Sequence, residues 1–126
     1  MSTKLESGKR TVLIVDDDAI YRKVLAKCLE AAGYQTLEAE HGESAIEILN
    51  QTSPCVILVD MLMPVMDGMQ LLLWLKEKAK QPITTIVLTC LDRSEVAGEA
   101  FLAGAADVLT KPFSLPALLK RLSTIV

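Results

Sequence analysis

The chain has 126 residues, of which 51% are hydrophobic and only 4% aromatic, and its formal net charge is -3. This is the length of one ordinary domain, whose core must be built mainly from Leu, Val, Ile, Ala and Met. The acidic balance argues against direct nucleic-acid binding, which requires a basic face.

The first ten residues are polar and charged and lack the apolar stretch of a secretory signal. No apolar run is long enough to span a bilayer, so we expect no membrane insertion. Cys28, Cys55 and Cys90 are odd in number and widely spaced, which favours three reduced thiols over a redox or metal site. We therefore expect a polar extension over residues 1–10, one domain over residues 11–126, and a cytoplasmic location.

Short apolar runs alternate along the chain with amphipathic stretches, which is the pattern of β-α-β units and a parallel sheet. The runs VLIV, VILV and TIVL are nearly unbroken in β-branched residues and Leu, as strands buried on both faces require. In chain order we predict a strand over Thr11–Val15, a helix over Ala19–Ala32, a strand over Gln35–Glu38, a helix over Glu43–Gln51, a strand over Cys55–Asp60, a helix over Met69–Lys80, a strand over Ile83–Thr89, a helix over Ser94–Ala103, a strand over Asp107–Thr110 and a final helix after Ser114.

Several residues mark the ends of these helices. Gly33 and Gly104 follow the first and fourth helices, where a glycine readily ends a helix. Asp18 is predicted to start the first helix, and Ser114 is predicted to cap the last, with Pro116 in its first turn. Five strands and five helices in strict alternation predict a doubly wound α/β domain. The flavodoxin-like strand order 2-1-3-4-5 would place a ligand crevice between the C-terminal ends of the first and third strands.

Polar residues follow four of the predicted strands, where a purely structural strand does not need them. The first strand runs into Asp16-Asp17-Asp18, the third ends at Asp60, the fourth ends at Thr89, and the fifth is followed by Lys111. Two carboxylates about 4 Å apart repel by roughly 4 kcal/mol at an effective dielectric near 20, and one lysine cannot offset several of them. The sequence therefore predicts a divalent cation with oxygen ligands, and Mg²⁺ suits a few carboxylates together with water and phosphate.

The segments VLIVDDD, VILVDMLMPVMDG, IVLT and VLTKPF resemble, in order and spacing, the response-regulator receiver family of two-component signalling. The resemblance covers Thr11 to about Leu122. It implies that Asp60 is the phosphoacceptor, that Asp17 binds Mg²⁺ directly, and that Asp16 binds it through water. It also implies that Leu62 contributes its backbone carbonyl to the metal.

The same resemblance assigns the remaining site residues. Thr89 matches the hydroxyl that moves to the phosphoryl group, and Lys111 matches the ammonium that pairs with it. The bond between Lys111 and Pro112 is typically cis in this family. One position departs from the family: Val108 stands where an aromatic residue usually swings inward on phosphorylation, so the readout of the signal is expected to differ or to be weaker.

The resemblance also implies partners and a reaction. The phosphoryl group would come from a sensor histidine kinase, a phosphotransfer protein or a small phosphodonor, and the chain would catalyse only its own phosphorylation and dephosphorylation. The face formed by the fourth helix, the fifth strand and the fifth helix would then contact an output domain, a partner protein or a second copy in a homodimer.

Parts of the sequence are also compatible with two other functions. The spacing Asp16-x-Asp18 after an apolar strand resembles the first motif of haloacid-dehalogenase-type phosphatases, with Asp16 as nucleophile, but the chain is short for that family and Asp60 would have no role. A pseudo-receiver that binds a partner without phosphorylation is supported only by Val108. Replacing Asp60 with Asn separates the three: the receiver loses phosphoryl uptake, the phosphatase keeps turnover, and the pseudo-receiver keeps its partner.

Overall fold

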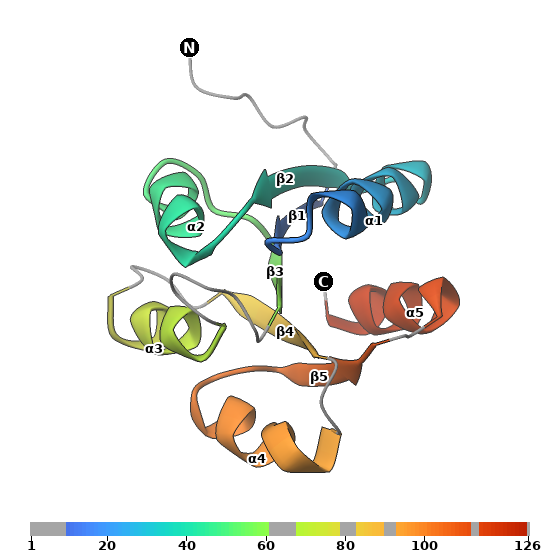
Figure 1. Cartoon of the computed structure of the whole chain (residues 1–126). Coiled ribbons are helices and arrows are strands. Elements are labelled where there is room, and N and C mark those ends of the chain that lie inside the picture. Colours follow the sequence, from blue (N-terminus) through green and yellow to red (C-terminus); the bar gives the residue numbers. More distant parts are fainter. Residues whose placement is uncertain (1–9, 61–67, 79–82, 90–92, 112–113, 126) are drawn as a thin grey trace.

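The computed structural model describes residues 10–60, 68–78, 83–89, 93–111 and 114–125 of the chain. Strands and helices alternate throughout this part, as predicted (Figure 1). The elements are β1 (Thr11–Val15), α1 (Ala19–Ala31), β2 (Gln35–Ala39), α2 (Gly42–Leu49), β3 (Val56–Asp60), α3 (Gly68–Lys78), β4 (Thr84–Thr89), α4 (Arg93–Leu102), β5 (Asp107–Thr110) and α5 (Leu115–Ile125).

The five strands form one parallel sheet in the order β2-β1-β3-β4-β5, which confirms the predicted doubly wound, flavodoxin-like topology. Helices α1 and α5 cover one face of the sheet, and α2, α3 and α4 cover the other (Figure 1). Because alternate residues of a strand point to opposite faces, each central strand supplies both layers of the core. In β1, Leu13 and Val15 pack on the side of α2 and α3, whereas Val12 and Ile14 pack on the side of α1 and α5.

Strand boundaries agree with the sequence prediction to within one residue. β1 and β5 have the predicted limits, while β2 extends to Ala39, whose carbonyl accepts the backbone N–H of Asp16 at 3.1 Å. Helix α2 ends at Leu49 instead of the predicted Gln51. Its last turn is closed by Thr52, which donates both its backbone N–H (2.9 Å) and its hydroxyl (3.1 Å) to the carbonyl of Ile48. The backbone N–H of Gln51 also donates to the carbonyl of Ile48, at 3.0 Å, and this bond to the third residue back tightens the chain into a turn after Leu49.

The glycines and capping residues predicted at the helix ends take those roles in the structure, although α1 and α4 each end one residue earlier than predicted. Gly33 and Gly104 have φ angles of 100° and 109°, a region that suits glycine because it lacks Cβ. Asp18 caps α1 by accepting the backbone N–H of Tyr21 at 3.1 Å, and Ser114 Oγ accepts the N–H of Ala117 at 3.2 Å. The sharp turns at the two glycines return the chain directly into β2 and β5.

No described helix combines the length and the apolar character that crossing a bilayer demands.

Candidate functional site

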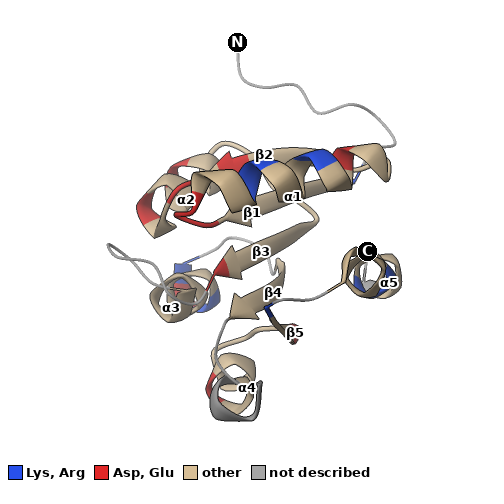
Figure 2. Cartoon of the chain, turned by 45° about the vertical axis from the view of Figure 1, so that its right-hand side comes forward, with Lys and Arg blue, Asp and Glu red and all other residues tan. Residues whose placement is uncertain are grey.

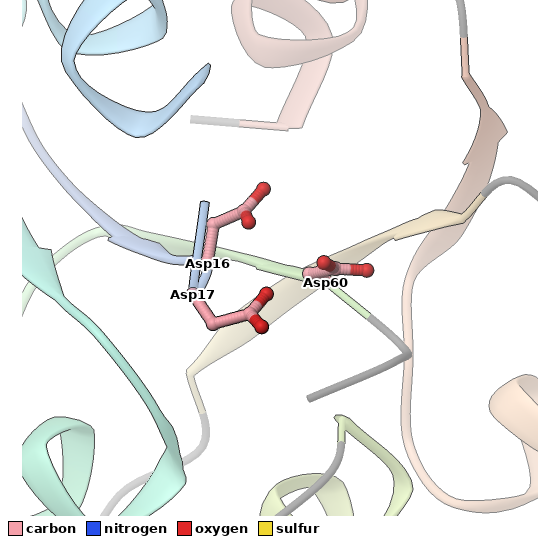
Figure 3. A group of neighbouring side chains, drawn as sticks. All are labelled: Asp16, Asp17 and Asp60. Atoms are coloured by element: carbon pink, nitrogen blue, oxygen red, sulfur yellow. The ribbon is translucent and has the colours of Figure 1, made fainter. Parts of the chain in front are cut away.

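An acidic cluster lies at the C-terminal edge of the sheet, between β1 and β3. Asp16 and Asp17 follow β1, and Asp60 ends β3; oxygen atoms from the three carboxylates all lie within 4.8 Å of one another (Figure 3). The register explains this meeting, because Val15 pairs with Val59 and the next residue on each strand is an aspartate. Acidic residues colour both the tip of β3 and the loop after β1 in Figure 2. The predicted convergence of Asp16, Asp17 and Asp60 is thus present in the structure.

The three carboxylates differ in their exposure to solvent. Asp16 is 1% exposed and Asp60 is 8% exposed, whereas Asp17 lies on the surface. Two buried anions side by side require nearby cations, because burial removes the water that would otherwise stabilise their charges. The exposed Asp17 leaves the cluster open to solvent on one side.

Lys111 supplies a cation from the end of β5. Its Nζ lies 3.1 Å from Asp16 Oδ2 and 3.7 Å from Asp60 Oδ2, and it also sits 4.2 Å from the centre of the Tyr21 ring. Burial alone would lower the pKa of the Lys111 ammonium. The hydrogen bond to Asp16 and the negative charges of Asp16 and Asp60 outweigh that effect, so its pKa is raised. Lys111 is therefore held as a cation, as the sequence prediction requires.

Arg22 secures the loop that carries the acidic pair. This arginine of α1 is buried; its Nη1 donates to the backbone carbonyl of Asp16 at 2.7 Å, and its Nε pairs with Glu38 Oε1 of β2 at 3.0 Å. Asp16 Oδ1 accepts the backbone N–H of Asp18 at 2.9 Å. The loop is thus tied to both α1 and β2. Sequence reasoning did not identify Arg22, although a charged residue on the Leu25–Leu29 side of α1 is a usable signal.

Thr89 lies at the end of β4, fully buried, beside the end of β3. Its backbone carbonyl accepts the N–H of Lys111 at 2.6 Å, which ties the ends of β4 and β5 together. Leu62 and Pro112, for which the family resemblance implies a metal-binding carbonyl and a cis peptide bond, lie outside the described residues.

The donor set fits a hard divalent cation. Three carboxylates against one ammonium leave an excess of two negative charges within this small group, and all its candidate metal-binding atoms are oxygens. Mg²⁺ binds through one or two carboxylates while keeping several waters, and the open side at Asp17 offers room for them.

A doubly wound sheet of order 2-1-3-4-5, with a carboxylate cluster and a lysine at its switch point, defines a flavodoxin-like domain built around a charged site. Residues 12–123 match the sequence model of the response regulator receiver domain, and the chain belongs to this family of two-component signalling domains. Receiver domains typically bind Mg²⁺ in an acidic pocket, become phosphorylated, and interact with histidine kinases and output domains. They are generally signalling modules and not enzymes.

Relatives of the chain have different functions. It is 36% identical over 118 residues to the phosphate regulon transcriptional regulatory protein PhoB of Pseudomonas aeruginosa, covering 93% of this chain and 52% of that protein. It is 38% identical over 109 residues to a cyclic di-GMP phosphodiesterase of Thermotoga maritima, covering 86% of this chain and 28% of the relative. The chain therefore spans about half, or less, of these relatives.

The fold is also similar to that of solved receiver structures. The chemotaxis protein CheY4 of Vibrio cholerae superposes with a TM-score of 0.85 at 30% identity, and the match covers 94% of this chain and 100% of CheY4. These proteins thus share the domain described above and differ in the length of chain outside it.

Proposed function

We propose that this chain is a phosphoacceptor, in which Asp60 takes a phosphoryl group in a Mg²⁺-dependent reaction. The observation that carries the proposal is the position of Lys111 Nζ, 3.1 Å from Asp16 and 3.7 Å from Asp60, in a group of three carboxylates. A buried carboxylate beside both a lysine and a metal-binding pair is suited to accept a phosphoryl group, because the new negative charge meets fixed positive charge.

Each residue then has a separate role. Asp16, Asp17 and Asp60 would hold Mg²⁺ together with the backbone carbonyl of Leu62, and the bound ion would neutralise charge on the phosphoryl oxygens. An Asp60 oxygen forms the new O–P bond while the donor's N–P bond, in a phosphohistidine, or O–P bond, in acetyl phosphate, breaks. The leaving group keeps the bonding electron pair. Lys111 pairs with a phosphoryl oxygen, and the Thr89 hydroxyl hydrogen-bonds another.

The signal would leave the site through β4 and β5. Thr89 ends β4, Lys111 directly follows β5, and the backbone N–H of Lys111 donates to the carbonyl of Thr89 at 2.6 Å. Movement of either residue toward the phosphoryl group would therefore affect both strands. The strands lead into α4 and α5, whose surface we assign to the output domain, partner protein or second copy. A coupling of about 1–3 kcal/mol is typical of such switches.

A sensor histidine kinase or a phosphotransfer protein is the proposed donor, and the output is proposed to lie in another domain or protein. The relatives support this division, because the chain matches only 52% of PhoB and 28% of the phosphodiesterase.

The pseudo-receiver remains the second candidate, on the observation that Val108 is buried and has no aromatic ring. The decisive experiment is intact-mass analysis after incubation with acetyl phosphate and Mg²⁺. We expect one added phosphoryl group in the wild type and none in Asp60→Asn. Asp18→Asn is the matched control, since Asn also caps a helix well and the residue lies beside the site. Equal labelling of Asp60→Asn would refute the assignment of the acceptor, and no labelling of the wild type would favour the pseudo-receiver.

A further inference from the structure

We propose that Tyr21 is a positioning residue of the phosphoryl site, whose ring holds the Lys111 ammonium against the carboxylates. The proposal rests on the function proposed above for its kinetic consequence, but its geometric part is independent. The observation is the distance of 4.2 Å from Lys111 Nζ to the centre of the Tyr21 ring, well inside the range of about 6 Å for a cation–π contact.

Tyr21 is part of a closed circuit of contacts that begins and ends at Asp16. Asp16 Oδ1 accepts the backbone N–H of Asp18 at 2.9 Å, and Asp18 Oδ1 accepts the backbone N–H of Tyr21 at 3.1 Å. The ring of Tyr21 then contacts Lys111, whose Nζ returns to Asp16 Oδ2 at 3.1 Å. The acid that pairs with the lysine therefore also fixes, through the cap of α1, the backbone of the residue that supports the lysine.

The ring itself is anchored in the core. Tyr21 is partly buried and packs against the apolar cluster that α1 and α5 form on the sheet, which includes Leu25, Leu29, Leu118 and Leu122. A lysine has four rotatable side-chain bonds and loses substantial conformational entropy when it is fixed. An anchored aromatic face beside the ammonium restricts the positions that it samples. Phe would preserve this effect, whereas Leu would fill similar space without attracting a cation.

The expected consequence is a site prepared for phosphoryl transfer before the donor arrives. Transfer of a phosphoryl group depends chiefly on positioned charge, so a lysine that must first be ordered slows the step. The Asp16 contact survives loss of the ring, so the reaction slows without stopping. Contacts of this kind correspond to a change of about fivefold in rate.

The test compares Tyr21→Phe and Tyr21→Leu with the wild type, using Tyr34→Leu as the matched control. Tyr34 is also partly buried against the same apolar cluster, but it precedes β2 at the opposite edge of the sheet from the acids. Two quantities are measured for each protein. The first is the NMR shift of the Lys111 ε-methylene protons, assigned with Lys111→Met, which an aromatic face moves upfield. The second is the initial rate of phosphorylation by acetyl phosphate with Mg²⁺.

We expect the upfield shift and the full rate in the wild type, Tyr21→Phe and Tyr34→Leu, and loss of the shift with about fivefold slower uptake in Tyr21→Leu. An ordinary ε-methylene shift in the wild type overturns the proposal, as does Tyr21→Leu at the wild-type rate. Equal slowing in Tyr34→Leu also overturns it, because general loss of packing then explains the rate. If the wild type takes up no phosphoryl group, the proposed function fails, while the shift still decides whether the ring holds Lys111.

Discussion

In the absence of metal, the Asp17 carboxylate should lower the free energy of unfolding of the domain. Its carboxylate lies in the group that includes Asp16 and Asp60, with oxygen atoms within 4.8 Å, while the only nearby cation described among the site contacts, Lys111, already pairs with the other two. Replacing Asp17 with Ala removes repulsion and little packing, because the side chain is exposed. Asp17→Ala should therefore raise the free energy of unfolding in metal-free buffer.

The expected size follows from the separation of the charges. Two unit charges 4.8 Å apart interact by about 3.5 kcal/mol at an effective dielectric of 20 and by about 0.9 kcal/mol at that of water. Asp17 faces two anions and one cation, so the net effect is close to one such repulsion. Because Asp17 is exposed, the lower figure applies, and we expect a gain of about 1 kcal/mol.

Asp16→Ala is the matched control and should change stability in the opposite direction. Asp16 is buried, accepts the backbone N–H of Asp18 at 2.9 Å and pairs with Lys111 at 3.1 Å. Hydrogen bonds to charged groups contribute about 1.5–3 kcal/mol each, so the two bonds of Asp16 together outweigh the repulsion that its removal relieves. We expect Asp16→Ala to lose about 2 kcal/mol.

Urea unfolding, followed by the fluorescence of the single tryptophan, Trp74 of α3, measures both changes in EDTA and again with Mg²⁺. Metal that binds the folded state adds about 2.7 kcal/mol at a hundredfold excess over Kd. The wild type should gain this stabilisation, and Asp17→Ala should gain little. Clear destabilisation of Asp17→Ala in EDTA, or an undiminished effect of Mg²⁺ on it, would refute the electrostatic reasoning.

Three further predictions concern other parts of the domain. The pKa of Lys111 is raised in the folded state, so the contribution of its charge to stability is complete below the ordinary pKa of 10.5 and is lost as the pH rises through the folded-state pKa. In urea unfolding above pH 10.5, Lys111→Met should therefore lose less stability with rising pH than the wild type does. His41 Nδ1 accepts the backbone N–H of Ser44 at 3.2 Å and caps α2, so His41→Ala should cost about 1 kcal/mol by thermal or urea unfolding and His41→Asn should cost much less. Because Val108 has no ring to move, amide shifts on beryllofluoride binding should concentrate near Asp60 and Lys111, and equally large shifts along α4 would contradict this.

The fold was predictable because the strands have a simple pattern. VLIV and VILV are continuous apolar runs of the kind that strands buried on both faces require, and the glycines after α1 and α4 mark the ends of these helices locally. The predicted end of α2 was wrong by two residues, because the chain tightens there into a bond from the Gln51 N–H to the carbonyl of Ile48, only three residues back. Such local tightening at a helix end leaves no periodic trace in a sequence.

The site was predictable only where topology alone brings residues together. Parallel strands end at the same edge, so the convergence of Asp16, Asp60 and Lys111 follows from the strand order. The contact of Tyr21 with Lys111 and the buried pair of Arg22 with Glu38 depend instead on side-chain directions across packed elements. The sequence would equally allow Tyr21 to be a surface residue, and the position of Arg22 on the Leu25–Leu29 side of α1 does not reveal which groups it contacts.

The place of β1 in the sheet has a consequence for biosynthesis. β1 is the first described strand, yet it lies between β2 and β3, and all five of its residues are buried. β1 can pair with β2 on one edge early, but its other edge gains a partner only when Val56 and the rest of β3 have been made. Until then a nascent chain carries an apolar strand with one open edge. Such non-local pairing slows folding and leaves an aggregation-prone strand edge exposed in the meantime. The apolar segment TVLIV is therefore a part of the growing chain that would benefit from protection by a chaperone.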